Sequence, residues 1–182
     1  MPNKGDTMSS YAAKLLPQIT EANPIIMGVS LGGMLATEIA ELIPTKKVIL
    51  ISSSKCTKEL PWLYRIAGFL GLLYIVPVAL VKHMYIIFYF LFGVKHQYDK
   101  ELLKAVIRDT DNTFLFRASK MVATWKRYNY NPAIVHIHGT ADKILYPFSI
   151  KANYWVKGGG HMMVMLNHKE VNAILAKILT VI

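Results

Sequence analysis

A serine stands between two glycines in residues 27–34, MGVSLGGM, directly after a short apolar run. A G-x-S-x-G turn between a strand and a helix is typical of a nucleophilic serine, because small residues such as Gly28 and Gly32 let the backbone bend and the hydroxyl project. A serine hydroxyl is a weak nucleophile at neutral pH, so it needs a histidine as base and a carboxylate that orients the histidine. Ser30 is therefore a candidate for acyl transfer if the chain supplies both partners.

Two later segments supply these partners. Asp142 lies in HGTADKILYP and His161 lies in KGGGHMMVM, and each of these two residues follows an expected strand. Open parallel sheets form their sites beyond the carboxyl ends of the strands, so the two side chains are expected near Ser30. Leu31 would be the first residue of a helix. Its N–H and the positive end of the helix dipole suit a developing oxyanion. The candidate roles are nucleophile for Ser30, acid for Asp142, base for His161 and oxyanion donor for Leu31.

Other residues in the chain could take the roles of acid and base. The alternatives are Asp109 and Asp111 for the acid, and His136, His138 and His168 for the base. The two aspartates fall in the expected helical middle of the chain. His136 and His138 would share one face of a strand, as structural histidines do, and His168 would open the last helix. We therefore favour Asp142 and His161.

The sequence lacks the patterns of other common sites. Neither GxGxxG nor GxxxxGK[ST] occurs, so a phosphate loop around Ser30 is not expected, although Ser30 could still be a structural residue of its turn. No HxxxH or HExxH spacing occurs, and Cys56 is the single cysteine, which excludes an intrachain disulfide and a multi-cysteine zinc site. We expect no metal and no cofactor.

Hydrophobic periodicity predicts the elements that carry the candidate residues. Strands are expected at 25–27, 47–53, 133–139 and 150–156, and helices at 9–19, 35–43, 102–107, 114–125 and 171–182. A strand, a tight turn, a helix and a second strand within about thirty residues form a βαβ unit, whose strands are parallel. The predicted class is α/β, with a mostly parallel sheet flanked by helices.

The segment 62–94 is unusually apolar. Residues 66–81 and 84–94 contain no charged side chain. These runs of sixteen and eleven residues are shorter than the ~20 residues of a membrane-spanning helix. Three interpretations remain: a membrane span, contact with a membrane surface, and a helical lid or partner-facing hairpin, which we favour.

Length and composition limit the remaining possibilities. The chain has 182 residues, enough for one domain, and 53% of them are hydrophobic. Its net charge of +10 is spread out, with no basic run of five or more, so nucleic-acid binding is not expected. The N-terminal residues lack the apolar core of a signal peptide, so we expect a cytoplasmic protein.

Three motifs together, GVSLGG, HGTAD and GGGH, resemble those of the α/β-hydrolase family in its chain order of serine, aspartate and histidine. The resemblance covers the C-terminal part of that family's fold. It implies a core formed by residues 1–54 and 129–182, and a helical, apolar cap formed by residues 55–128. It also implies a serine hydrolase of carboxylesterase type that uses Ser30, Asp142 and His161 on a small hydrophobic ester.

The chain departs from the family before its serine. Members carry several strands ahead of the nucleophile, and a loop after an early strand supplies the second oxyanion N–H, for which this chain shows no source. We therefore expect a truncated sheet, which a second chain or a homodimer would complete. Two alternatives stay open: a weak or inactive homologue that acts as an interaction or dimerisation module, and an acyltransferase with the same three residues. The cap would be the part that contacts a membrane surface.

Overall fold

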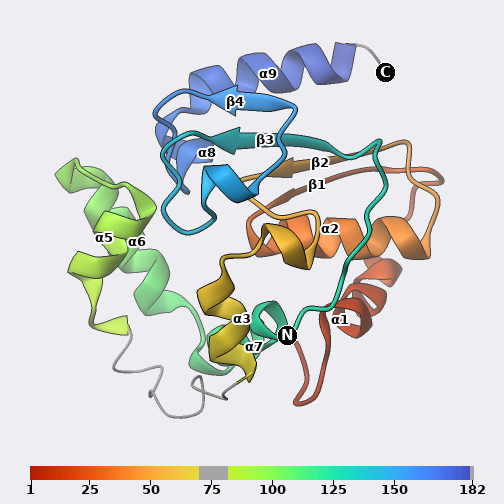
Figure 1. Cartoon of the computed structure of the whole chain (residues 1–182), viewed down its shortest axis with the longest axis horizontal. Helices are drawn as coiled ribbons and strands as arrows, with labels where there is room; N and C mark the ends of the chain where they lie inside the picture. Colours follow the sequence, from red (N-terminus) through yellow and green to blue (C-terminus); the bar gives the residue numbers. More distant parts are fainter. Residues whose placement is uncertain (70–81, 181–182) are drawn as a thin grey trace.

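Four parallel strands form the centre of the molecule (Figure 1). The computed structural model describes residues 1–69 and 82–180. The strands are β1 (Ile25–Val29), β2 (Lys47–Ile51), β3 (Val135–Gly139) and β4 (Tyr154–Val156), and they lie in the order β1-β2-β3-β4. Each strand pairs in parallel with the next, and Gly28 lies opposite Leu50 in the first pair. All four carboxyl ends therefore meet at one edge, where the candidate residues follow β1, β3 and β4.

Helices cover both faces of this sheet. On one face lie α1 (Met8–Leu15) and α2 (Leu31–Leu42), and on the other lie α8 (Met163–Leu166) and α9 (His168–Thr180) (Figure 1). Alternate residues of β2 point to opposite faces: Leu50 packs in a cluster with Ala36 of α2, whereas Ile49 and Ile51 pack in a cluster with Val171 of α9. Apolar residues on both faces are typical of a buried parallel strand.

The middle of the chain is helical. It contains η2 (Thr57–Glu59), α3 (Trp62–Phe69), α5 (Tyr85–Phe92), α6 (Gln97–Asp109) and α7 (Asn112–Ala123). In Figure 1, α5 and α6 lie beyond the tips of the strands, while α3 packs against α7. The division into a core and a cap at residues 55–128 remains a prediction. No helix of the described residues is long and apolar enough to cross a bilayer, and residues 70–81 of the predicted apolar segment lie outside that description.

The element boundaries follow local chemistry. The first helix begins one residue before the predicted one, because Thr7 and Ser10 form a reciprocal capping box, and its last turn tightens into η1 (Leu16–Gln18) at Pro17. The predicted strand at 150–156 is shorter, because its first residue ends the turn η4 (Pro147–Ser149). Helix α5 ends at Gly93, which adopts the left-handed conformation (φ 74°).

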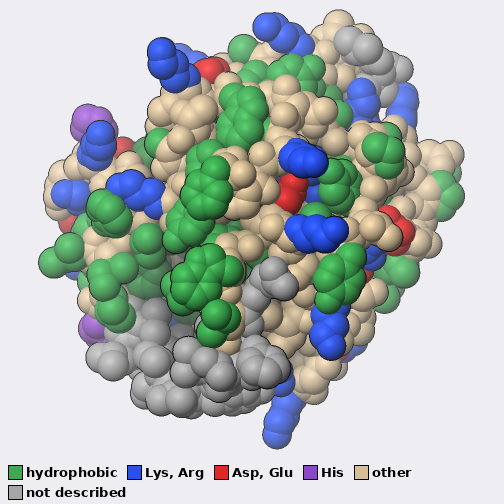
Figure 2. Space-filling model, viewed as in Figure 1, with side chains coloured by type: hydrophobic (Ala, Val, Ile, Leu, Met, Phe, Trp, Pro, Cys, Tyr) green, Lys and Arg blue, Asp and Glu red, His purple; other side chains and the backbone are tan. Residues whose placement is uncertain are grey.

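Strand β1 forms an edge of the sheet. In the described parts of the chain it pairs with β2 alone, and Ile25, Met27 and Val29, which lie on the face opposite to Ile26 and α2, are exposed. An unpaired parallel edge with apolar side chains agrees with the expected truncation of the sheet. Further hydrophobic side chains lie at the surface over α5 (Figure 2).

Candidate active site

Ser30 occupies a strained turn between β1 and α2. Its backbone lies at φ 51° and ψ −120°, where a side chain is rarely tolerated. Two hydrogen bonds hold this conformation: the Ser30 N–H donates to the carbonyl of Ile51 at 3.0 Å, and the Ser53 hydroxyl donates to the carbonyl of Ser30 at 2.6 Å. The turn is thus anchored to β2 and to the loop after it.

Close backbone packing explains the glycines around Ser30. A Cβ atom on Gly28 would lie 2.1 Å from the carbonyl oxygen of Gly32, so this position excludes any larger residue. A Cβ on Gly32 itself would meet nothing within 4 Å. The second crowded position is Gly33, where a Cβ would lie 2.4 Å from the Ser53 hydroxyl. The G-x-S-x-G pattern names Gly28 and Gly32, and it does not reveal Gly33 or Ser53.

The structure brings Ser30, His161 and Asp142 into one row of hydrogen bonds. His161 Nε2 lies 2.9 Å from Ser30 Oγ, and His161 Nδ1 lies 2.8 Å from Asp142 Oδ2. The three residues follow β1, β4 and β3, so they meet at the carboxyl edge of the sheet.

The alternative acids and bases have other surroundings. Asp109 pairs with Arg108, and Asp111 caps α7 through the N–H of Phe114. His168 begins α9, where its Nδ1 lies 3.0 Å from the carbonyl of Met165. His136 is fully buried in the sheet, and burial lowers its pKa to about 2, so it is neutral. None of these four residues reaches Ser30 in the described structure.

Asp142 is held as a buried carboxylate. It is 2% exposed, and its Oδ1 accepts the N–H groups of Ile144 and Leu145 at 2.8 and 2.9 Å. Burial would raise the pKa of Asp142, but hydrogen bonds from His161 and from these two N–H groups outweigh burial and lower the pKa. Because an ionised carboxylate can only accept, His161 Nδ1 carries a proton, and Nε2 is left to accept the Ser30 hydroxyl proton.

Comparison with known proteins identifies the fold. No protein-family model matches the sequence, and neither does any curated protein. The structure is similar to an esterase from Thermogutta terrifontis (15% identity, 99% of this chain and 74% of that chain covered, TM-score 0.70). It is also similar to a hydrolase from Pseudomonas aeruginosa (12% identity, 98% of this chain and 74% of that chain covered, TM-score 0.70). A third similar structure is an enol-lactonase from Burkholderia xenovorans (16% identity, 98% of this chain and 75% of that chain covered, TM-score 0.68). The chain has the α/β-hydrolase fold. The predicted resemblance and fold class are confirmed, and the chain is shorter than these neighbours.

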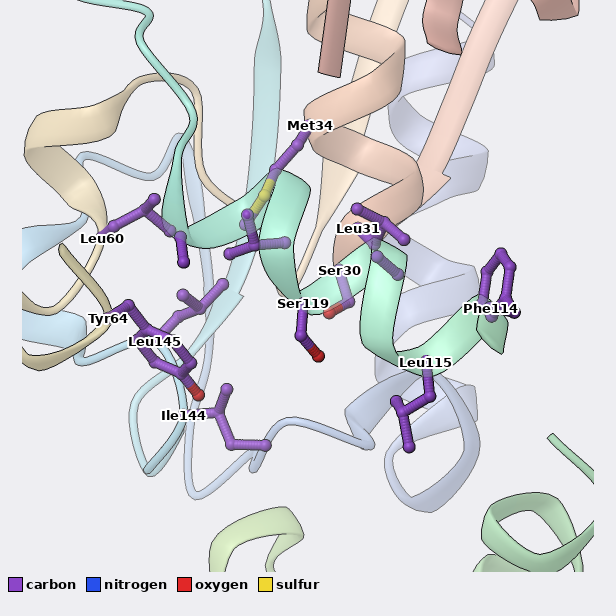
Figure 3. A pocket seen from close by; sticks show the side chains of 13 residues that line it. Ser30, Leu31, Met34, Leu60, Tyr64, Phe114, Leu115, Ser119, Ile144 and Leu145 are labelled. Atoms are coloured by element: carbon purple, nitrogen blue, oxygen red, sulfur yellow. The ribbon is translucent and has the colours of Figure 1, made fainter. Parts of the chain in front are cut away.

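In this α/β-hydrolase fold, an apolar pocket of about 290 Å³ opens beside Ser30 (Figure 3). Its lining comes from α2, the start of α3, α7 and the loop after Asp142: Ser30, Leu31, Met34, Leu60, Tyr64, Phe114, Leu115, Ala118, Ser119, Val122, Ala123, Ile144 and Leu145. None of these described residues is charged. In Figure 3 the side chains of Ser30 and Ser119 lie between two groups of lining residues, with Leu60, Tyr64, Ile144 and Leu145 on one side and Leu31, Phe114 and Leu115 on the other. The sequence placed α7 in the predicted cap but singled out none of its residues as site residues, although the stripe of Phe114, Ala118 and Val122 was the signal.

The backbone N–H of Leu31 and the side chain of His138 complete the site of this α/β-hydrolase fold. Leu31 lines the pocket beside Ser30 and is the first residue of α2, and its N–H has no hydrogen-bond acceptor among the described residues, so this N–H is a candidate oxyanion donor. His138 is fully buried, and its Nε2 donates at 2.9 Å to the carbonyl of Leu145. Burial lowers the pKa of His138, which keeps the ring neutral. His138 thus fastens the loop whose N–H groups hold Asp142, a role that sequence reasoning missed.

Proposed function

We propose that the chain is a serine hydrolase of carboxylesterase type that acts on small, uncharged, hydrophobic esters. The observation that carries this proposal is the row of hydrogen bonds from Ser30 through His161 to Asp142 at an apolar pocket. A hydrogen-bonded serine and histidine, with the histidine oriented by a buried carboxylate, are the groups that nucleophilic acyl transfer requires.

Acylation follows from the positions of these atoms. Ser30 Oγ attacks the ester carbonyl carbon while His161 Nε2 takes its proton, and the new positive charge on the ring is stabilised by Asp142. The oxyanion of the tetrahedral intermediate faces the N–H of Leu31 at the N-terminus of α2, where the helix dipole favours negative charge. His161 then returns the proton to the leaving alcohol, and the acyl group stays on Ser30.

Deacylation repeats the same proton transfers with water. His161 Nε2 takes a proton from a water molecule, whose oxygen attacks the acyl carbon, and the proton then passes to Ser30 Oγ as the acid leaves. Among residues 1–69 and 82–180, this mechanism assigns one N–H donor to the oxyanion, that of Leu31. Because removing one oxyanion donor typically costs ~100 to 1,000-fold in turnover, we expect slower catalysis than in a site with two donors.

The pocket supports a small hydrophobic substrate. Its volume of about 290 Å³ falls at the lower end of ligand pockets, and its polar groups are the hydroxyls of Ser30, Ser119 and Tyr64. A charged acyl group would lose its hydration there without gaining a partner. The structural neighbours named as an esterase and a lactonase support an ester-type bond as the target.

Covalent labelling tests the proposal. A fluorophosphonate reacts when an activated serine oxygen attacks phosphorus and expels fluoride, and intact mass spectrometry detects the adduct. We expect one label per chain on the wild-type protein, none on Ser30→Ala and one on Ser119→Ala, the matched variant from the same pocket. Hydrolysis of short p-nitrophenyl esters should fall by at least about a thousandfold in Ser30→Ala.

Two results would contradict the proposal that Ser30 is a nucleophile. If the folded wild-type protein takes no label, or if Ser30→Ala keeps both label and turnover, the serine is not an activated nucleophile. Circular dichroism of each variant ensures that a missing label does not reflect unfolding. In that case the site is architecture alone, and the interaction module becomes the better explanation.

A further inference from the structure

Helix α5 exposes apolar side chains that a buried helix would cover. Its eight residues, YIIFYFLF, include no charged or amide side chain, and none of the eight is buried. Four side chains at its start and along its outer side form what we call the α5 patch: Met84 (42% exposed), Ile86 (83%), Ile87 (46%) and Phe90 (63%). A helix that is hydrophobic all round is normally enclosed, so an uncovered one marks a contact surface.

The other side of α5 packs against the active site. Phe92 packs its ring edge-to-face with that of His161, with centroids 5.4 Å apart, and Val94, just after the helix, is buried. The helix is therefore anchored toward the active site on one side and faces outward with the α5 patch. Figure 2 shows hydrophobic side chains gathered over this part of the surface, with Lys and Arg side chains beside them.

Lysines lie beside helix α5, on its tyrosines and at the edge of the α5 patch. Lys104 Nζ lies 5.4 Å from the centre of the Tyr85 ring, and Lys100 Nζ lies 5.7 Å from that of Tyr89. Lys143 Nζ lies over the ring of Phe90, at 3.3 Å, and the exposed Lys95 follows the helix. In residues 1–69 and 82–180, none of these four lysines forms an ion pair with a carboxylate. Their ammonium groups thus remain available to an anionic partner.

We propose that the α5 patch docks on the surface of a membrane that contains anionic lipids. Apolar side chains would enter the boundary between headgroups and acyl chains, tyrosines would lie at headgroup depth, and lysines would contact lipid phosphates. The net charge of +10 adds a long-range attraction to such a surface. This arrangement favours a lipid surface over a protein partner, because a lipid surface matches both the apolar centre and the cationic border without shape complementarity.

This docking does not rest on the proposed hydrolase activity. No residue of the α5 patch lines the pocket or contacts Ser30 in the described structure. If both proposals hold, Phe92 connects the docked helix to His161. Vesicle binding and fluorophosphonate labelling fail independently, so each proposal can be tested without the other.

Vesicle co-sedimentation tests the docking with the whole chain. We expect the wild-type protein to sediment with phosphatidylcholine vesicles that contain phosphatidylglycerol, and much less with phosphatidylcholine alone or in high salt. The double variant Ile86→Glu with Ile87→Glu should lose about tenfold in partitioning, and Lys100→Gln with Lys104→Gln should lose its preference for anionic vesicles. Leu179→Glu on α9 is the matched control, because Leu179 is also exposed (48%) but belongs to a helix that covers a face of the sheet, away from the α5 patch, and it should bind like the wild type.

Two outcomes would overturn the proposal. In the first, the folded wild-type protein stays in the supernatant with anionic vesicles, or the Ile86 and Ile87 double variant binds as well as the wild type. In the second, the wild-type protein does not bind vesicles but forms dimers in sedimentation velocity, and the same double variant is monomeric. The α5 patch would then be a protein interface. Far-UV circular dichroism of each variant reports whether the fold is kept.

Discussion

The hydroxyl of Ser53, in the loop after β2, donates to the carbonyl of Ser30 in the turn after β1, over 2.6 Å. Ser53 is fully buried, and its side chain fills the space that the absent Cβ of Gly33 leaves. The strained backbone of Ser30 is therefore held from the neighbouring strand as well as by its own helix. Strain of this kind persists only where the surroundings enforce it.

Replacing Ser53 should loosen the turn. We expect Ser53→Ala to lower the free energy of unfolding by about 1 kcal/mol, since a buried hydrogen bond is lost, and to slow fluorophosphonate labelling of Ser30. Ser54→Ala is the matched control, because the buried Ser54 hydroxyl has no hydrogen-bond partner in the described structure. Urea unfolding measures both variants. Equal losses in Ser53→Ala and Ser54→Ala would contradict the special role of Ser53.

The two glycines of the G-x-S-x-G pattern should differ in their tolerance of substitution. Gly28→Ala places a methyl group 2.1 Å from a backbone oxygen, so we expect it to destabilise the fold by several kcal/mol or to prevent folding. Gly32→Ala meets open space within α2, and it should be neutral or stabilising by up to ~1 kcal/mol. Thermal unfolding of the pair checks this, and a severe loss in Gly32→Ala would contradict it.

His138 should act on catalysis through the loop that it fastens. We expect His138→Leu to lower kcat more than it changes KM, because the Leu145 carbonyl loses its donor and the N–H groups that hold Asp142 shift. His138→Gln can place an amide donor at the same depth and should recover part of kcat. A Gln variant as impaired as the Leu variant would indicate that packing alone explains the effect.

The width of the pocket should decide the preferred acyl chain. Ser119 lines the pocket from α7 and has no hydrogen-bond partner in the described structure, so replacing it breaks no hydrogen bond there. The larger side chain of Ser119→Leu would fill the space beside Ser30. We expect kcat/KM for p-nitrophenyl hexanoate to fall at least about tenfold more than for the acetate, while Ser119→Ala changes neither by more than a few-fold. A uniform loss for both esters would place Ser119 outside the acyl site.

Glu38 should make the fold sensitive to acid. Burial would raise the pKa of Glu38, but hydrogen bonds from Arg127 and Trp125 outweigh it and lower the pKa. The unfolded chain then binds more protons than the folded one, so stability falls as the pH drops below the ordinary value of 4.5 toward the folded pKa. Glu38→Gln should cost ~2 kcal/mol at neutral pH and flatten this acid slope, as measured by urea unfolding at several pH values. An unchanged slope would rule out Glu38 as its source.

The local pattern and the chain order of the candidate residues could be predicted from the amino-acid sequence alone. Apolar runs and glycines placed Ser30 between a strand and a helix, and they placed Asp142 and His161 after two later strands. Such features depend on residues a few positions apart, whose backbone preferences and periodicity can be recognised without the fold. The α/β class and the parallel sheet followed from the same pattern.

The contacts of these residues could not be predicted from the sequence, because they depend on the folded chain. Ser30 and His161 are 131 positions apart, and their 2.9 Å separation depends on the register of four strands. Tertiary contacts also decided that Ser53 supports Ser30, that His138 fastens the loop of Asp142, and that α5 has an uncovered side. No local pattern encodes such contacts, because each arises where packed elements meet, and packing depends on the whole chain.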